Sequence, residues 1–71
     1  METNISEFVR TRRKSLRMTQ NALSEKSGVG LRFIRDIEQG KITLRLDKVN
    51  QVLNLFGFEL GPVEMRKKFE K

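Results

Sequence analysis

Apolar residues recur at helical spacing near the start of the chain. One face of the expected helix carries Ile5, Phe8, Val9 and Leu16. Asn4, followed three residues later by Glu7, has the pattern of a capping box, so the first helix is expected from about Ile5 to Leu16. Four basic residues lie between the apolar positions and are most simply the solvated face of that helix: Arg10, Arg12, Arg13 and Lys14.

Two shorter helices are expected next, with a tight turn between them. Thr19 can cap residues 20–27 with its hydroxyl, and Gly28 can end that helix. Residues 31–39 form the second of the two. Isolated helices of under about 12 to 15 residues are marginal in water, so both must pack against the rest of the chain.

The last third of the sequence predicts one more helix and then a short strand. Helical spacing links Leu46, Val49, Val52, Leu53 and Phe56, after which Gly57 can end the helix. Phe58-Glu59-Leu60 alternates apolar and polar residues, as a strand does. No other segment alternates, so its backbone partners would come from a second chain, as a ribbon across a dimer axis. The alternative is an extended tail that caps the core. Residues 65–71 are expected to fray rather than to add a helical turn.

Composition excludes several classes of protein. The 71 residues make one domain, and they include neither cysteine nor histidine. Disulfides, thiolate nucleophiles and cysteine-based zinc sites are therefore excluded, and the commonest general base is missing. Asp36 and Glu38 are two apart on a helix and do not face each other, so we expect no enzyme, no cofactor and no metal. No apolar run approaches the roughly 18 residues that span a bilayer, and no secretory signal is visible, which favours a cytoplasmic protein.

The charge balance points towards polyanions. Fifteen lysines and arginines against nine acids give a net charge of +6 and a pI near 10.3. Tryptophan and tyrosine are both absent, so the aromatic platforms typical of single-strand binding are missing. A core below about 70 to 80 residues supplies little net stability, so we expect a second subunit to help.

The two short helices have the outline of a helix-turn-helix. Counting Gln20 as the first position, the small residue Ser24 is fifth, where the helices cross, and Gly28 is ninth, in the turn. The inward apolar positions that follow are Val29, Ile34 and Ile37. An ordinary helical hairpin of a bundle is the alternative, but it does not require these residue types at these offsets.

These positions resemble the Cro/cI (XRE) family of phage-repressor-like DNA-binding domains. The resemblance runs from about Val9 to Leu60 and is carried by Met18-Thr19-Gln20, Leu23-Ser24, Gly28-Val29, Phe33-Ile34 and Ile37-Glu38-Gln39-Gly40-Lys41. Leu55-Phe56-Gly57-Phe58-Glu59-Leu60 is similar to the HipB-like and Y4mF-type antitoxin branch, in which a short strand pairs across the dimer. The sequence departs from the family pattern at Ser27, Gly30 and Leu44, where the family more often has an apolar residue, a serine or threonine cap, and a proline.

The resemblance implies an all-α, lambda-repressor-like bundle of four to five short helices with a short C-terminal dimerising β-strand. Residues 1–57 would be the helix-turn-helix DNA-binding domain, and residues 58–71 the dimerising strand and basic tail. The dimer interface is expected at Phe58, Leu60 and Leu55. Two domains related by a two-fold axis would present recognition helices about 34 Å apart and bind a palindromic operator. In the family, the arginine at the position of Arg13 commonly pairs with the glutamate at the position of Glu38.

Roles in DNA binding follow from the position of the recognition helix in the major groove. Arg32 and Arg35 can each donate two hydrogen bonds to guanine, Leu31 can lie against a thymine methyl, and Gly30 lets the backbone approach closely. Phosphate contacts are expected from Gln20, Lys41 and Thr43, with Lys26, Arg45 and Arg17 as weaker candidates. The family's glutamine at the position of Gln20 also braces the recognition helix. Phe33 is expected to pack inward rather than touch a sugar.

The predicted function is a sequence-specific repressor that binds double-stranded DNA as a homodimer, in the cytoplasm and associated with the nucleoid. The antitoxin resemblance implies a HipB-like antitoxin that represses its own operon and binds a HipA-like kinase toxin. Alternatives are a stand-alone phage or mobile-element regulator, a protein-only adaptor, and non-specific binding of RNA or anionic membrane by a basic surface.

Overall fold

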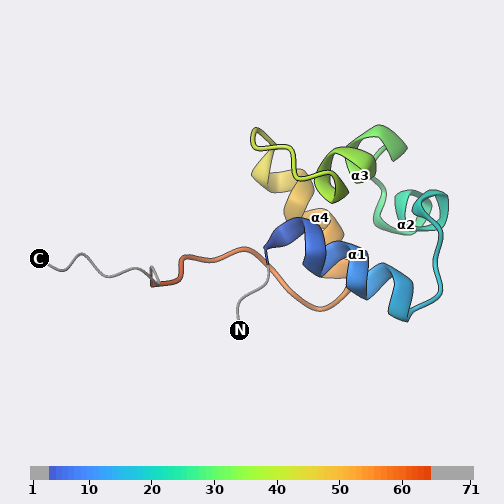
Figure 1. The fold of residues 1–71 in the computed structure, drawn as a ribbon, viewed down its shortest axis with the longest axis horizontal. Coiled ribbons are helices and arrows are strands. Elements are labelled where there is room, and N and C mark those ends of the chain that lie inside the picture. Colours follow the sequence, from blue (N-terminus) through green and yellow to red (C-terminus); the bar gives the residue numbers. More distant parts are fainter. Residues whose placement is uncertain (1–3, 65–71) are drawn as a thin grey trace, which may run out of the picture.

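Four helices make up the fold in residues 4–64, the part of the chain that the computed structural model describes (Figure 1). They are α1 (Ile5–Ser15), α2 (Gln20–Ser27), α3 (Leu31–Glu38) and α4 (Leu46–Leu55). The all-α class is therefore confirmed. The first and third helices end one residue earlier than predicted, because Leu16 and Gln39 are their C-caps, each donating its amide to carbonyls of the last turn.

The helix starts differ in how they are capped. Asn4 Oδ1 accepts a hydrogen bond from the Glu7 amide at 2.8 Å, and Thr19 Oγ1 accepts one from the Ala22 amide at 3.0 Å. By contrast, α3 and α4 begin without a side-chain cap. Helices of eight to eleven residues with such starts depend on packing for their stability.

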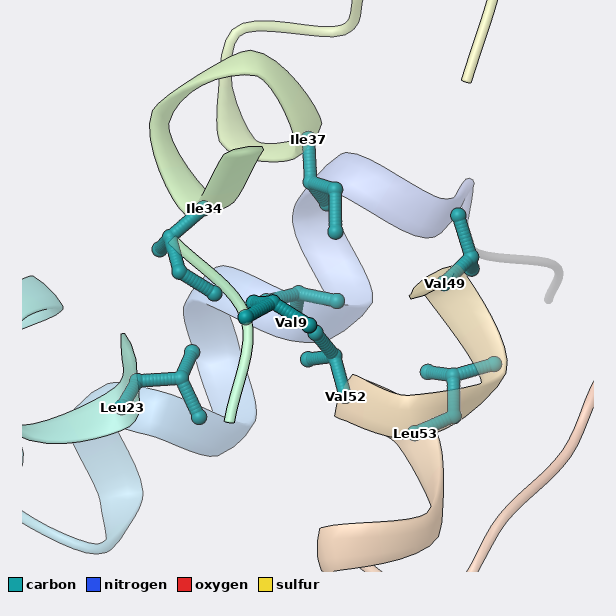
Figure 2. Packing of buried hydrophobic residues seen from close by; sticks show 8 residues of the cluster. Val9, Leu23, Ile34, Ile37, Val49, Val52 and Leu53 are labelled. Atoms are coloured by element: carbon teal, nitrogen blue, oxygen red, sulfur yellow. The ribbon is translucent and has the colours of Figure 1, made fainter. Parts of the chain in front are cut away.

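A small apolar core joins the four helices and the α2–α3 turn (Figure 2). Its buried members are Val9, Leu23, Val29, Ile34, Ile37, Val49, Val52 and Leu53. Figure 2 shows Val9 of α1 in the middle of this cluster, with Ile34 and Ile37 on one side and Val52 on the other. Partly buried residues surround it, and Phe33 is one of them, packed against the core.

Two apolar positions of the predicted helical faces do not join the core. Leu16 is 57% exposed, because it lies in the turn that leads away from α1. Leu46 is 70% exposed in the first turn of α4. The expectation that Leu16 shares one buried helical face with Val9, and Leu46 one with Val49, was therefore wrong.

The chain after α4 runs back along the outside of the bundle. Gly57 has a φ of 85°, which glycine adopts without strain, and the Phe58 amide donates to the Leu53 carbonyl at 2.9 Å. The Phe58 ring then meets the Phe8 ring edge-on, with centroids 4.8 Å apart, and the Leu60 amide donates to Asn50 Oδ1 at 2.7 Å. In a single chain this segment takes the course of the extended tail.

No β-strand is present in residues 4–64. The predicted strand at 58–60 needs a partner from a second chain, so the ribbon across a dimer axis stays a prediction. Residues 65–71, where fraying was expected rather than a last helical turn and where the basic tail lies, are outside the described residues. Within the described part of the chain, no helix is long and apolar enough to cross a membrane.

Candidate nucleic-acid interface

The turn between α2 and α3 is fixed by hydrogen bonds that span it. Gly28 ends α2 with a φ of 85°, and its amide donates to the Ser24 carbonyl at 3.0 Å. Ser24 Oγ donates to the Val29 carbonyl at 2.6 Å. Ser24 is therefore small enough for the two helices to cross closely, and its hydroxyl also fixes the turn through a hydrogen bond.

The same turn is tied to α4. Gln51 Nε2 donates to the Ser27 carbonyl at 3.1 Å, and a Cβ placed on Gly28 would lie 3.0 Å from that nitrogen. Ser27 is buried, although the family pattern has an apolar residue there. Its hydroxyl is satisfied locally, since it accepts from the Val29 amide at 3.4 Å and reaches the Ser24 carbonyl at 3.5 Å. Ser27 therefore places no unpaired hydroxyl in the core, although the family has an apolar residue at this position.

The C-terminal end of α3 is anchored by an ion pair between Arg13 of α1 and Glu38. Arg13 donates through Nε to Glu38 Oε2 at 2.7 Å and through a terminal nitrogen to Oε1 at 3.0 Å. Only 12% of the Arg13 side chain and 5% of the Glu38 side chain are exposed. A second terminal nitrogen of Arg13 donates to the Met18 carbonyl at 2.9 Å, which adds the α1–α2 connection to the network.

The pair shifts the pKa of both groups. Burial by itself would raise the pKa of Glu38, but hydrogen bonds from Arg13 and Gln20 and the charges of Arg13 and Arg10 bring that pKa below its ordinary value. The hydrogen bond to Glu38 raises the pKa of Arg13 further. Both side chains are therefore held in their charged forms at neutral pH.

Two further side chains join the anchor. Gln20 Nε2 donates to Glu38 Oε1 at 3.1 Å, so the first residue of α2 braces the end of α3. Arg10 donates to the Glu38 carbonyl at 2.9 Å, where its charge also complements the negative end of the helix dipole. The solvated-face interpretation was wrong for Arg10 and Arg13, which are partly buried, and it fits Lys14, which is exposed. Sequence reasoning missed the role of Arg10, and its only signal was its place one helical turn before Arg13.

The outward side of α3 carries the residues expected to read bases. Arg32 and Arg35 are exposed, and Gly30 has open space where a Cβ would stand. Leu31 is only partly exposed. Asp36 lies on the same side and was not expected there as part of the interface: it is 3.8 Å from Arg32 and 3.7 Å from Lys41.

The residues expected to contact phosphates differ in their exposure and in whether a carboxylate lies near them. Lys26, Thr43 and Arg17 are exposed, and Arg17 has a φ of 58°. Lys41 is 52% exposed and lies near Asp36. Arg45 donates two hydrogen bonds to Asp47, at 2.7 and 3.2 Å, which lowers the pKa of that carboxyl and offsets the Arg45 charge.

The expected dimer residues leave apolar surface open. Phe58 is 42% exposed and Leu55 is 39% exposed, while Leu60 is partly buried. Arg12 lies with its guanidinium carbon 4.9 Å from the centroid of the Phe58 ring and 5.3 Å from that of Phe8, a cation–π arrangement. An open hollow beside the segment is lined by Ile5, Phe8, Leu53, Phe58, Glu59, Leu60, Gly61 and Val63.

The described residues hold no cluster of side chains suited to bind a metal ion. Among residues 4–64, no group of three or more histidine, cysteine, aspartate or glutamate side chains is arranged to hold a metal ion.

Comparison with known proteins places these observations in a family. The sequence profile of the "Helix-turn-helix" family matches residues 9–63. The chain is also 45% identical over 67 residues to a protein of Sinorhizobium fredii (strain NBRC 101917 / NGR234) named "Uncharacterized HTH-type transcriptional regulator y4mF". That match covers 90% of this chain and 88% of the relative. No solved structure matches the chain.

Proposed function

Because the chain belongs to the Cro/cI (XRE) family of helix-turn-helix transcriptional regulators, we propose that it represses transcription by binding a specific double-stranded DNA sequence with α3 in the major groove. The observation that carries the proposal is the exposure of Arg32 and Arg35 on a helix whose opposite side is fixed to the core by Ile34, Ile37 and Glu38. A rigid helix with two exposed guanidinium groups is suited to reading base edges.

Base reading is assigned to the outward residues of α3. Arg32 and Arg35 each present a planar pair of donors that matches guanine O6 and N7, a contact worth about 1 to 3 kcal/mol of discrimination. Leu31 offers an apolar surface to a thymine methyl, and Gly30 allows close approach of the backbone.

Phosphate contacts are assigned to residues at the helix starts and in the α3–α4 connection. Lys41 and Thr43 lie in that connection, and Lys26 and Arg45 are further exposed candidates. Gln20 has a double role: one amide hydrogen goes to Glu38, and the other remains for a phosphate oxygen. These contacts set the register of the protein on DNA and carry no sequence information.

Dimerisation completes the proposal. Phe58, Leu55 and Leu60 leave apolar area uncovered on a domain whose core is small, and a second copy of the chain would bury it. A symmetric dimer would present two α3 helices to a palindrome with half-sites about 34 Å apart.

The finer proposal is a HipB-like antitoxin that represses its own operon and binds a HipA-like kinase toxin. Its support is the similarity of the segment 55–60 to that antitoxin branch. A stand-alone phage or mobile-element regulator is the competing role, because nothing in DNA binding itself requires a toxin.

Selection of bound duplexes from a random pool tests the DNA-binding proposal directly. The expected product is a palindrome whose half-site centres are about 10 base pairs apart. Equal retention of all duplexes, with affinity falling uniformly as salt rises, would instead establish non-specific polyanion binding. No retention at all would favour a protein-only adaptor.

The antitoxin role has its own test. Co-expression with the product of the adjacent gene is expected to give a stable complex that still binds the selected palindrome, and to relieve growth inhibition by that product. If the adjacent gene encodes no kinase-like protein and the chain alone represses its promoter fully, the stand-alone regulator is the better description.

A further inference from the structure

Asp36 is an acidic residue on the side of α3 that is proposed to face DNA. The inward side of the helix is defined by its buried residues Ile34, Ile37 and Glu38. Successive residues of an α-helix are about 100° apart, so Arg32 and Asp36 both lie opposite this buried set, one turn from each other. A carboxylate at this place repels phosphate and by itself disfavours DNA binding.

The carboxylate lies between two cations. Oδ1 is 3.8 Å from Arg32 Nε, and Oδ2 is 3.7 Å from Lys41 Nζ. Exposure of the side chains is 22% for Asp36, 87% for Arg32 and 52% for Lys41, so both cations stay open to solvent. The Asp36 carbonyl also accepts from the Lys41 amide at 3.0 Å, which holds the start of the α3–α4 connection beside it.

Arg35 provides an internal contrast. It is also exposed on α3, but in the described part of the chain no carboxylate lies within ion-pair distance of it. Asp36 therefore lies within ion-pair distance of one of the two candidate base-reading arginines and not of the other.

We propose that Asp36 determines sequence specificity: it restrains Arg32 for base contact and offsets the charges of Arg32 and Lys41 against phosphate. The inference rests on the proposed function. Since Asp36 contacts Arg32 through Nε, the two terminal nitrogens remain available for guanine O6 and N7. The ion pair can therefore persist while Arg32 binds guanine, whereas a phosphate bound by Arg32 or Lys41 lies close to the carboxylate and is repelled by it. Specific binding therefore loses less to Asp36 than non-specific binding does.

Replacing the carboxylate by its neutral isostere tests this. In Asp36→Asn, affinity for random duplex is expected to rise several-fold, and the slope of log affinity against log salt to steepen by about 0.9 for each phosphate newly contacted. Preference at the base pair read by Arg32 is expected to fall by about tenfold, while preference at the position read by Arg35 stays the same. Glu25→Gln removes the same unit charge from an exposed position on α2 and is expected to change neither quantity. Asp36→Glu keeps the charge and is expected to keep weak binding to random duplex.

Combining substitutions separates action through Arg32 from direct contact with a base. In an Arg32→Ala background, Asp36→Asn is expected to cause no further change in base preference. A continued change would assign a base contact to Asp36 itself and overturn the positioning role. If the wild-type protein selects a palindrome and Asp36→Asn selects the same one with an unchanged ratio to random duplex, the inference fails and the proposed function stands. If the wild-type protein selects no sequence, the proposed function itself fails.

Discussion

Arg13 of α1 and Glu38 of α3 lie 2.7 Å apart, joined by two hydrogen bonds, and only 5% of the Glu38 side chain is exposed. Twenty-five residues separate them in the sequence, so the pair closes the helix-turn-helix against the first helix. Two further side chains that hydrogen-bond to Glu38, Arg10 and Gln20, also come from α1 and α2. The end of the candidate recognition helix is thereby fixed by charge as well as by the apolar core.

Removing the carboxylate is expected to destabilise the fold strongly. Glu38→Ala leaves the largely buried Arg13 without its charged partner, and breaking a buried ion pair from one side costs about 3 to 5 kcal/mol. Urea unfolding measures the loss. Glu25→Ala, an exposed acid on α2, is the matched control and is expected to change the free energy of unfolding by no more than about 0.5 kcal/mol. Similar losses in both variants would show that the pair has no special weight.

The same pair predicts how stability depends on pH. The pKa of Glu38 is lower in the folded protein than in the unfolded chain, because Arg13 and Gln20 hydrogen-bond to its charged form despite burial. Its contribution is therefore fully present above the unfolded pKa, about 4.3, and is lost as pH falls through the folded pKa. Urea midpoints recorded from about pH 7 to pH 3 are expected to fall more steeply for wild type than for Glu38→Gln.

Asp47 titrates in the same direction and must be controlled. Hydrogen bonds from Arg45 lower its pKa, although the pair is exposed. Comparing the Asp47→Asn variant with the Glu38→Gln/Asp47→Asn double variant isolates the contribution of the buried Glu38 carboxyl. Parallel acid profiles for the two proteins would contradict the assignment to Glu38.

Gly28 is expected to resist substitution for two separate reasons. Its φ of 85° strains any residue with a Cβ, and that Cβ would lie 3.0 Å from Gln51 Nε2. Gly57 has the same φ with nothing within 4 Å. Gly57→Ala therefore measures the strain alone, about 1 to 2 kcal/mol, and Gly28→Ala should cost more in thermal or urea unfolding. Adding Gln51→Ala to Gly28→Ala tests the second reason: if the clash matters, the double variant loses less than the two single losses combined.

The secondary structure could be predicted from sequence because its signals are local. Thr19 caps α2 through its own hydroxyl, Gly28 ends it in the left-handed conformation, and Ile34 and Ile37 are buried as their spacing predicted. Such features depend on a few neighbouring residues. They can be recognised without knowing how the helices pack, which is why the helix bounds differ by one residue at most where both ends were predicted.

The arrangement of charges could not be predicted in the same way. Arg10 and Arg12 look alike in the sequence, yet Arg10 donates to the Glu38 carbonyl while Arg12 lies over the rings of Phe8 and Phe58. Which of two neighbouring arginines meets a distant helix depends on how α1 crosses α3. Asp36 was missed for a related reason: its closeness to Lys41 depends on the path of the chain after α3.

Arg32 is expected to matter far more for cognate than for random DNA. Arg32→Ala removes a base contact worth about 1 to 3 kcal/mol, and so should weaken binding to the selected palindrome by roughly 5- to 150-fold while changing random duplex much less. Titrations of both duplexes at one salt concentration measure the ratio. Lys14→Ala, which removes an exposed charge from α1, is expected to leave that ratio unchanged. Equal losses on both duplexes would make Arg32 a phosphate contact.

The segment after Gly57 is expected both to cover the core of its own chain and to form the dimer interface. Truncation after Gly57 removes the Phe58 ring, which packs on Phe8 and Arg12. It also removes the Leu60 amide, which donates a hydrogen bond to Asn50 Oδ1. The shortened chain should therefore be monomeric and poorly folded. Because loss of folding would by itself abolish a dimer, a second variant is needed. Glu59 is exposed between the two apolar residues, and Glu59→Pro removes its backbone donor while leaving Phe58 and Leu60 in place.

Sedimentation separates the two roles of this segment. If residues 58–60 pair as strands across a two-fold axis, Glu59→Pro should shift the chain towards monomer while its helical circular dichroism persists. If the segment only caps the core of its own chain, the proline variant should sediment as wild type does. An unchanged dimer in the truncated chain would remove the strand from the interface altogether, and the contacts that join two recognition helices would then have to come from the helices of the bundle.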